Sequence, residues 1–221
     1  MKTDYMLHEE RYRQLLSSGR QGWEDNEQHA RSLDLLARIM TWSEVPQGGR
    51  ALELGCGDGR KSLWLARRGW AVSGVDIAPT AIEWARRKAG AAELQVDFRV
   101  GSVLDLADFA DGELDLVIDG HCAHCIVGAD RAALLGATRR VLRSSGVFVL
   151  ITMCGEPPAT VADQFDPGTR CLVRNGIATR HVGTRESLLG ELEAAGFHVV
   201  RSEIIPRRDA DDCAELVAVA R

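Results

Sequence analysis

The chain has 221 residues, of which 45% are hydrophobic and 27% are charged, a composition typical of one soluble globular domain. Its net charge of −5 offers no basic surface to attract nucleic acid or anionic lipid, so we expect a small-molecule partner. The start "MKTDYMLHEE" lacks the apolar core of a signal peptide, and no apolar run approaches the ~20 residues of a membrane helix. We therefore predict a cytoplasmic protein whose six cysteines are thiols.

The first 45 residues carry two helical patterns, which are separated by "SSGRQGW". The second pattern places Leu33, Leu36, Ala37 and Met40 on one face. We predict that residues 1–45 form a helical lid on the remainder of the chain, residues 46–221, within one structural domain.

From about residue 50, short β-rich runs alternate with helical ones. The predicted strands are 50–54, 70–76, 94–100, 114–118, 146–152, 197–205 and about 214–220, and the predicted helices are 60–69, 79–90, 130–142 and 188–195. This alternation predicts a Rossmann-like, doubly wound α/β sheet of seven strands, in which ligands bind beyond the carboxyl ends of the strands.

Residues 155–183 interrupt the alternation. They contain three of the six prolines and show no clear period. Long irregular segments in compact domains are either functional or surface decoration, and we predict that this insert lies over the substrate site.

A glycine-rich loop, "ALELGCGDGR", follows the first predicted strand. Gly55, Gly57 and Gly59 permit a sharp turn and a close approach of the backbone to a ligand, and the helix that follows points unpaired amides at the same place. Asp76 ends the second strand, where a carboxylate can accept the two hydroxyls of an adenosine ribose. The loop and the acid together predict a nucleotide-like cofactor.

With "ELGCGDG" and "VSGVD", residues from about 50 to 220 resemble the class I S-adenosylmethionine-dependent methyltransferases. The glycines read G-x-G-x-G, an acid at Glu53 precedes them, and "AGFHVV" resembles the start of that family's antiparallel last hairpin. The resemblance implies S-adenosyl-L-methionine as cofactor and a sheet with an antiparallel last strand.

The resemblance also implies a role for individual residues. Glu53 and the loop with Gly55, Cys56 and Gly57 would hold the methionine part of the cofactor. Asp76 would take the ribose hydroxyls. The adenine would pack on Ile77 and lie near Ser102 and the Val103 backbone. Family members often have an adenine-binding Asp after the third strand, where this sequence offers Ser102, with Asp105 three residues further on.

The segment "GRQGWEDN" resembles the lid of the thiopurine and tellurite methyltransferase branch. There, an aromatic residue lies near the cofactor. Trp23 is therefore either a lid residue at the cofactor or a core anchor for the N-terminal helices.

The most distinctive stretch is "DGHCAHC" at 119–125, directly after the fourth predicted strand. By topology alone, Asp119 and His121 then lie near the cofactor. A neutral histidine can remove a proton from an accepting hydroxyl, amine or thiol, so His121 or His124 is the predicted general base. Either histidine could instead hold the loop in place.

The cysteines of this stretch leave several interpretations open. Cys122 and Cys125 form a C-x-x-C between two histidines, but no second ligand pair exists elsewhere in the sequence, so we expect no metal. The two thiols either pack in the core or contact a soft thiol or metalloid substrate.

The predicted function is thus methyl transfer to a small molecule at oxygen, nitrogen or sulfur. The alternatives are an NAD-dependent oxidoreductase and a non-catalytic metal- or metalloid-binding protein that uses His121, Cys122, His124 and Cys125. Periodicity leaves the acceptor atom and the oligomeric state open.

Overall fold

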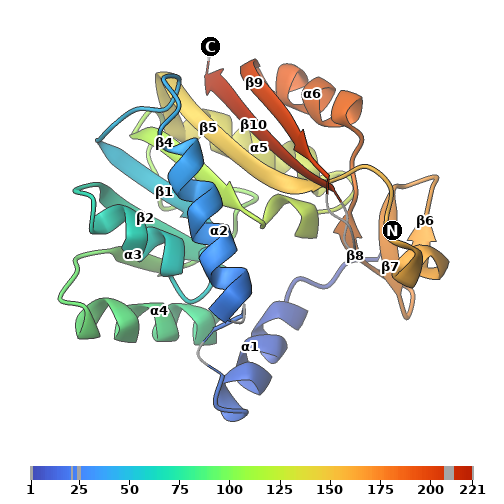
Figure 1. Ribbon diagram of the computed structural model, residues 1–221, viewed down its shortest axis with the longest axis horizontal. Helices are drawn as coiled ribbons and strands as arrows, with labels where there is room; N and C mark the ends of the chain where they lie inside the picture. Colours follow the sequence, from blue (N-terminus) through green and yellow to red (C-terminus); the bar gives the residue numbers. More distant parts are fainter. Residues whose placement is uncertain (1, 21, 24–25, 207–211, 221) are drawn as a thin grey trace.

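The computed structural model describes residues 2–20, 22–23, 26–206 and 212–220. Its centre is a seven-stranded sheet in the order β3-β2-β1-β4-β5-β10-β9 (Figure 1). The strands are β1 (Arg50–Leu54), β2 (Ala71–Asp76), β3 (Asp97–Val100), β4 (Leu114–Gly120), β5 (Leu142–Cys154), β9 (Phe197–Ile205) and β10 (Asp212–Ala220). β10 runs antiparallel to both of its neighbours, and the remaining neighbouring pairs are parallel. The predicted sheet and its antiparallel last strand are confirmed.

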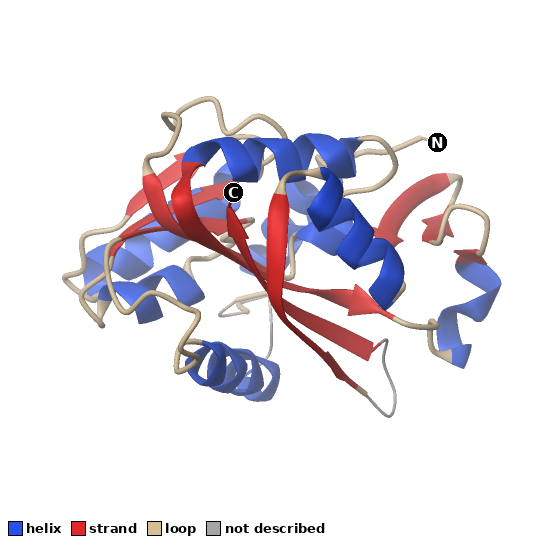
Figure 2. Cartoon of the chain, turned by 90° about the horizontal axis from the view of Figure 1, so that it is seen from above, coloured by secondary structure: helices blue, strands red, loops and turns tan. Residues whose placement is uncertain are grey.

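Helices cover both faces of this sheet (Figure 2). They are α1 (Leu7–Ser17), α2 (Asn26–Ile39), α3 (Arg60–Ala66), α4 (Pro79–Ala91), α5 (Asp130–Val141) and α6 (Arg185–Ala194), with a short 3₁₀ turn η1 (Ala123–Cys125) after β4. None of the helices in the described part of the chain is long and apolar enough to cross a membrane.

The central strands are apolar on both faces because each face is covered. In β5, Phe148 and Leu150 pack in the cluster that includes α5 and α6, whereas Val147, Val149 and Ile151 pack in the cluster that includes α2. Alternate side chains of a strand point to opposite faces, so the run "VFVLI" supplies both cores. This two-sided burial fixes the strand ends, and therefore the position of the loops that follow them.

The two N-terminal helices lie in different places. The apolar face of α2 packs on the sheet through Leu36 and Ile39. The other helix, α1, is anchored to α4 by the buried Glu9, whose carboxylate accepts hydrogen bonds from the Thr80 amide at 2.9 Å and the Thr80 hydroxyl at 2.7 Å. An acidic side chain at a helix N-terminus satisfies amides that have no partner within the helix.

The insert, residues 155–183, is more regular in structure than its sequence pattern indicates. It forms a second, three-stranded sheet of β6 (Phe165–Asp166), β7 (Cys171–Arg174) and β8 (Ile177–His181), preceded by η2 (Ala159–Gln164). Asn175 and Gly176 connect β7 and β8 with φ of 51° and 73°. Two successive positive φ values match the tight hairpin turn that Asn-Gly favours. The absence of a clear sequence period thus did not indicate this small sheet, and the position of the insert over the substrate site stays a prediction.

Candidate functional site

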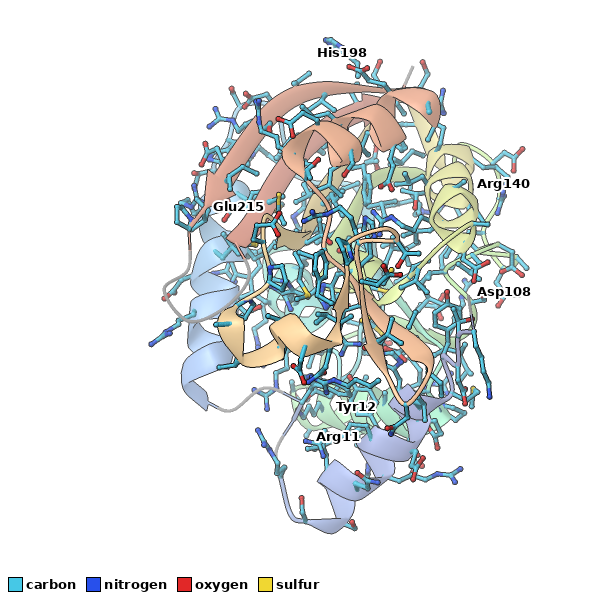
Figure 3. The ribbon with its side chains drawn as sticks, turned by 90° about the vertical axis from the view of Figure 1, so that its right-hand side faces the viewer. Arg11, Tyr12, Asp108, Arg140, His198 and Glu215 are labelled. Carbon is cyan, nitrogen blue, oxygen red and sulfur yellow. The ribbon has the colours of Figure 1, made fainter. Side chains whose placement is uncertain are left out.

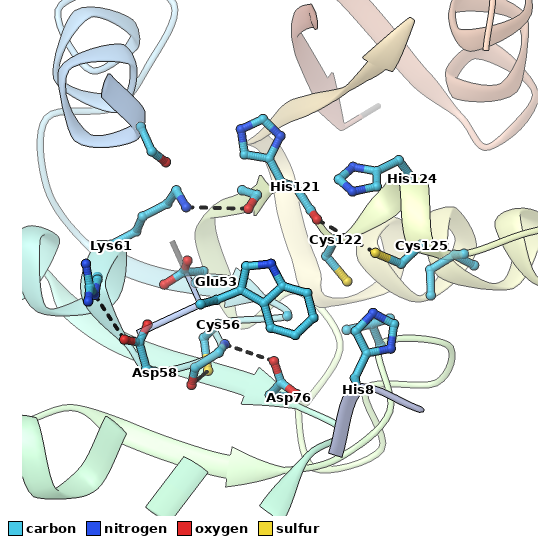
Figure 4. A pocket seen from close by; sticks show the side chains of 18 of the residues that line it. His8, Glu53, Cys56, Asp58, Lys61, Asp76, His121, Cys122, His124 and Cys125 are labelled. Atoms are coloured by element: carbon cyan, nitrogen blue, oxygen red, sulfur yellow. Dashed lines mark hydrogen bonds and ion pairs between the residues drawn. The ribbon is translucent and has the colours of Figure 1, made fainter. Parts of the chain in front are cut away.

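A cavity of about 1170 Å³ opens beyond the carboxyl ends of β1, β2 and β4. Its wall is built by α1, α2, the glycine loop, the loop after β4, β8 and the start of β10 (Figure 4). Figure 3 labels two wall residues from opposite ends of the chain, Tyr12 on α1 and Glu215 on β10. All but one of the predicted site residues line this cavity, and Asp119 is the exception.

The glycine loop requires glycine because its backbone adopts positive φ values and because neighbouring atoms leave no room for a Cβ. Gly55 and Gly57 have φ of 57° and 53°, which side-chain-bearing residues rarely adopt. A Cβ added at Gly57 would lie 2.3 Å from the Tyr12 hydroxyl oxygen, and one at Gly55 would lie 2.7 Å from the Cys122 sulfur. The loop backbone is thus packed closely between α1 and the loop after β4.

Asp76 ends β2 in the cavity wall and is 7% exposed. Its Oδ2 accepts a hydrogen bond from the Gly57 amide at 2.9 Å, and its Oδ1 accepts one from the Ala78 amide at 2.9 Å (Figure 4). Burial raises the pKa of Asp76, and the two amide bonds act in the opposite direction. Each carboxylate oxygen keeps a second lone pair, so the group can still accept ligand hydroxyls.

Glu53 lies inside β1 and is 2% exposed. Its Oε2 accepts hydrogen bonds from the Ser62 amide at 2.8 Å and from the Ser62 hydroxyl at 2.6 Å. Burial raises the pKa of Glu53 to about 7, and the positive charge of Lys61 opposes this shift. Glu53 therefore ties the glycine loop's strand to α3 at the cavity wall.

The predicted adenine side contains Ile77, Ser102 and Val103, all of which line the cavity. The Ser102 hydroxyl oxygen accepts a hydrogen bond from the Leu104 amide at 3.1 Å, so it also stabilises its own turn. Asp105 lies outside this cavity.

Trp23 lies both at the cavity and against the packed N-terminal helices, and its role as a lid at the cofactor stays a prediction. It lines the cavity, and its ring packs against the Tyr12 ring with a centroid distance of 5.1 Å and against the His8 ring at 5.9 Å. It also packs against the buried cluster that joins α1 to α4. Gln21, Glu24 and Asp25 of the same segment lie outside the described residues.

Asp119 is placed differently from the prediction. It is fully buried below the loop that follows β4, and its Oδ1 accepts a hydrogen bond from the Ala123 amide at 2.7 Å. Burial raises the pKa of Asp119 to about 7, and the amides of Ala123 and Cys122 lower it. The carboxylate therefore holds the loop that carries the two histidines and does not line the cavity.

The histidines His121 and His124 both line the cavity, with their ring centroids 6.0 Å apart (Figure 4). His121 has a φ of 77°, an uncommon conformation for a residue with a side chain. His124 is 8% exposed, and its Nδ1 has no hydrogen-bond partner within the described ranges. Burial, followed by the positive charge of Arg180, holds the pKa of His124 well below its usual 6.5, so the ring is neutral at physiological pH.

The cysteines next to these histidines are thiols. Burial raises the pKa of Cys122 well above its usual value and that of Cys125 to about 11. Both line the cavity, and Cys122 packs against the glycine loop. Among the described residues, no group of three or more His, Cys, Asp or Glu side chains is arranged to hold a metal ion.

Sequence reasoning missed several wall residues. Tyr12 and His8 come from α1, and Lys61 follows the glycine loop. The Lys61 ammonium lies 3.5 Å from the Gly120 carbonyl oxygen. Arg180 comes from β8, more than 50 residues from the histidine loop in sequence. The Asn-Gly turn at 175–176 was the signal that could have predicted this hairpin, but no local pattern indicates that Arg180 reaches the cavity.

Comparison with known proteins agrees with this geometry. Residues 52–150 match a family model described as "Methyltransferase domain". An "S-adenosyl-L-methionine-dependent Diels-Alderase iccD" of Talaromyces variabilis is 33% identical over 180 residues, which cover 76% of this chain and 59% of the relative. The "Ubiquinone biosynthesis O-methyltransferase" of Xanthomonas oryzae pv. oryzae is 36% identical over 113 residues, 51% of this chain and 46% of the relative.

A solved structure shares the fold over nearly the whole chain. It is the 1,6-didemethyltoxoflavin-N1-methyltransferase of Burkholderia thailandensis with bound 1,6-didemethyltoxoflavin and S-adenosylhomocysteine. Its TM-score is 0.72 at 20% identity, over 97% of this chain and 87% of that structure. The curated relatives are longer, since the matched part spans only 59% and 46% of their lengths. The matched domain and the relatives support the resemblance to the class I S-adenosylmethionine-dependent methyltransferases, and the solved structure shows the same fold.

Proposed function

We propose that the protein transfers a methyl group from S-adenosyl-L-methionine to a small-molecule acceptor, with His124 as the general base. One observation carries this proposal: a single cavity holds both the glycine-loop cradle and a buried neutral histidine whose Nδ1 has no partner in the described protein. The proposed substrate is a small molecule and not a nucleic acid, because the net charge of −5 disfavours a polyanion. A cytoplasmic location stays a prediction.

The residues at the cradle fit the cofactor. Glycine at 55 and 57 keeps Cβ atoms out of a tightly packed turn, and Asp76 offers acceptor oxygens at the cavity wall, where ribose hydroxyls need them. Trp23 and Ile77 offer apolar surface in the same cavity. When bound, S-adenosylmethionine supplies an electrophilic methyl group on a sulfonium sulfur.

The chain's own contribution to the reaction is alignment and proton removal. Methyl transfer is an in-line displacement, so holding cofactor and acceptor in one cavity provides much of the rate enhancement. His124 accepts the acceptor's proton, since burial keeps the ring neutral. Asp119, through the Ala123 amide, keeps the loop that carries His124 in position.

The test measures transfer of a labelled methyl group from S-adenosylmethionine to a panel of hydroxyl, amine and thiol compounds. We expect the wild type to methylate at least one class, and His124→Gln to lower kcat by roughly 10²- to 10⁴-fold with unchanged affinity for S-adenosylhomocysteine. The acid limb of the wild-type pH–rate profile should lie well below pH 6.5, because the pKa of His124 is depressed. A His124→Gln variant with the full rate, or a wild type that methylates no member, would contradict the proposal.

A second candidate function is ring formation assisted by a bound, unconsumed cofactor. It is favoured by the relative from Talaromyces variabilis, which is described as a Diels-Alderase and aligns with 76% of this chain. An assay with a polyene substrate separates the two candidates. If the protein catalyses ring formation, a cyclic product forms while S-adenosylhomocysteine does not accumulate. Stoichiometric release of S-adenosylhomocysteine would support methyl transfer instead.

A further inference from the structure

The cationic side chains of the cavity wall differ in their partners. The guanidinium of Arg38 forms ion pairs with Glu203 and Glu215, and that of Arg60 pairs with Asp58. By contrast, the hydrogen bond given for Arg180 runs from its Nη1 to the Thr179 carbonyl oxygen at 2.7 Å. Across the residues that the structure describes, no carboxylate lies within ion-pair distance of Arg180.

Arg180 is held on a strand with hydrogen-bonded neighbours. It lies next to the last residue of β8, which pairs with β7 on one edge, while the Ala178 amide donates a hydrogen bond at 3.0 Å to the Lys2 carbonyl oxygen. Its neighbour His181 is 9% exposed and lies beside Cys171, with 4.0 Å between the Cys171 sulfur and the His181 Nδ1. Successive side chains of a strand point to opposite sides, so Arg180 faces the cavity while His181 packs within the insert.

The charge of Arg180 acts on neighbouring titratable side chains of the wall. Arg180 acts electrostatically on His8, His124 and Cys125, and in the two histidines its charge lowers the pKa. The wall carboxylates Glu53, Asp58 and Asp76 already accept hydrogen bonds from protein groups. A half-buried guanidinium without a counter-ion is a site for an anionic ligand group, and its planar fork matches a carboxylate.

We infer that Arg180 binds a carboxylate of the substrate, so that the acceptor is a small organic acid whose reactive group lies at His124. This inference rests on the proposed function for the identity of the cavity. It gives the insert a role in substrate selection, since β8 supplies the anion contact while the loop after β4 supplies the base. His124 and Arg180 line the same cavity, so an acid held at Arg180 can present its reactive group to the His124 ring.

The test uses benzoate as the probe and benzamide as its neutral isostere. Protein labelled with ¹⁵N at histidine is titrated with each probe by NMR, and the His124 signals are assigned by their loss in His124→Gln. We expect benzoate to shift these signals saturably and benzamide to bind at least tenfold more weakly, because a charge-assisted bidentate contact is lost. Arg180→Gln should weaken benzoate binding about tenfold, and Arg180→Lys should fall between the two.

Arg174→Gln is the matched control, because Arg174 lies on β7 of the same small sheet, outside the cavity, with its Nε bonded to Gln164. It should bind benzoate like the wild type. Equal affinities for benzoate and benzamide, no response to benzoate, or equal binding by wild type and Arg180→Gln would overturn the inference. Each titration is run with and without S-adenosylhomocysteine. If S-adenosylhomocysteine does not bind, only the proposed function is contradicted. The role of Arg180 is still tested, because benzoate affinity is compared between wild type and the Arg180 variants in the absence of that ligand as well.

Discussion

At the scale of single residues, the site depends on positions that accept only one type of residue. Gly57 is such a position, because its φ is 53° and its Cα faces the Tyr12 hydroxyl. Its importance could be predicted from the G-x-G-x-G pattern, whereas the contact with Tyr12 could not, since the two residues are far apart in the sequence. The same holds for Asp76, whose position at a strand end is evident in the sequence but whose bond to the Gly57 amide is not.

Gly57→Ala should therefore impair both stability and cofactor binding. The left-handed backbone costs an alanine about 1–2 kcal/mol, and the new Cβ displaces Tyr12 from the cavity wall. The measurements are urea unfolding and titration with S-adenosylhomocysteine. Gly136→Ala is the control: it lies within α5 with no atom near the added Cβ, so it should raise the free energy of unfolding by about 1 kcal/mol. Equal effects of the two substitutions would contradict this account of the loop.

The raised pKa of Glu53 predicts how the stability of the protein depends on pH. Its folded-state pKa of about 7 lies above the ordinary 4.5, so the folded protein binds this proton more tightly than the unfolded chain. The stability that Glu53 contributes is then fully present below about pH 4.5 and is lost as the pH rises through about 7. Glu53→Gln, which mimics the protonated group, should gain stability relative to the wild type between pH 5 and pH 8, as measured by urea unfolding at each pH. A stability difference that does not change with pH would show that Glu53 is ionised throughout.

At the scale of secondary-structure elements, the sequence predicts the sheet well and the insert poorly. Strands such as β1 and β9 are continuous apolar or alternating runs bounded by glycine or proline, so their limits are local properties. The β7–β8 hairpin is short and partly polar, and its stability comes from contacts with the loop after β4 and with the N-terminal segment. Such tertiary contacts have no local signature.

Arg131 shows how one element positions another. This buried arginine on α5 donates hydrogen bonds to the carbonyl oxygens of Ala123 and Ile126, at 2.9 Å and 3.2 Å, and forms two hydrogen bonds to the Glu191 carboxylate on α6. It thereby joins the loop that carries His124 to two helices. Its position in a predicted amphipathic helix gave no indication of this role.

Arg131→Met should lower the free energy of unfolding by about 3 kcal/mol, because removing one partner leaves buried carbonyls and a carboxylate unsatisfied. It should also lower kcat by loosening the His124 loop, with little change in the affinity for S-adenosylhomocysteine. Chemical denaturation and steady-state kinetics provide the two measurements. Arg139→Met, on the same helix and without an ion pair in the described structure, should leave both quantities near the wild-type values.

At the scale of the whole molecule, the cavity is an assembly of distant segments. The cofactor cradle follows from one compact motif and was predictable, whereas the substrate side combines α1, α2, β8 and the start of β10. Their meeting at one sheet edge depends on the packing of the entire chain. This explains why Arg180, Tyr12 and His8 were missed. It also explains why Asp119 was predicted to lie near the cofactor: the residue is at the expected strand end, but its carboxylate bonds the Ala123 amide of the following loop.

The central claim is that this cavity binds S-adenosylmethionine through the glycine loop and Asp76. Isothermal titration of the wild type with S-adenosylhomocysteine, beside Asp76→Ala and a titration with NADH, tests it most directly. We predict one binding site per chain in the wild type, loss of measurable binding in Asp76→Ala, and no heat with NADH. Absence of S-adenosylhomocysteine binding by the folded wild type, or saturable binding of NADH in its place, would contradict the claim.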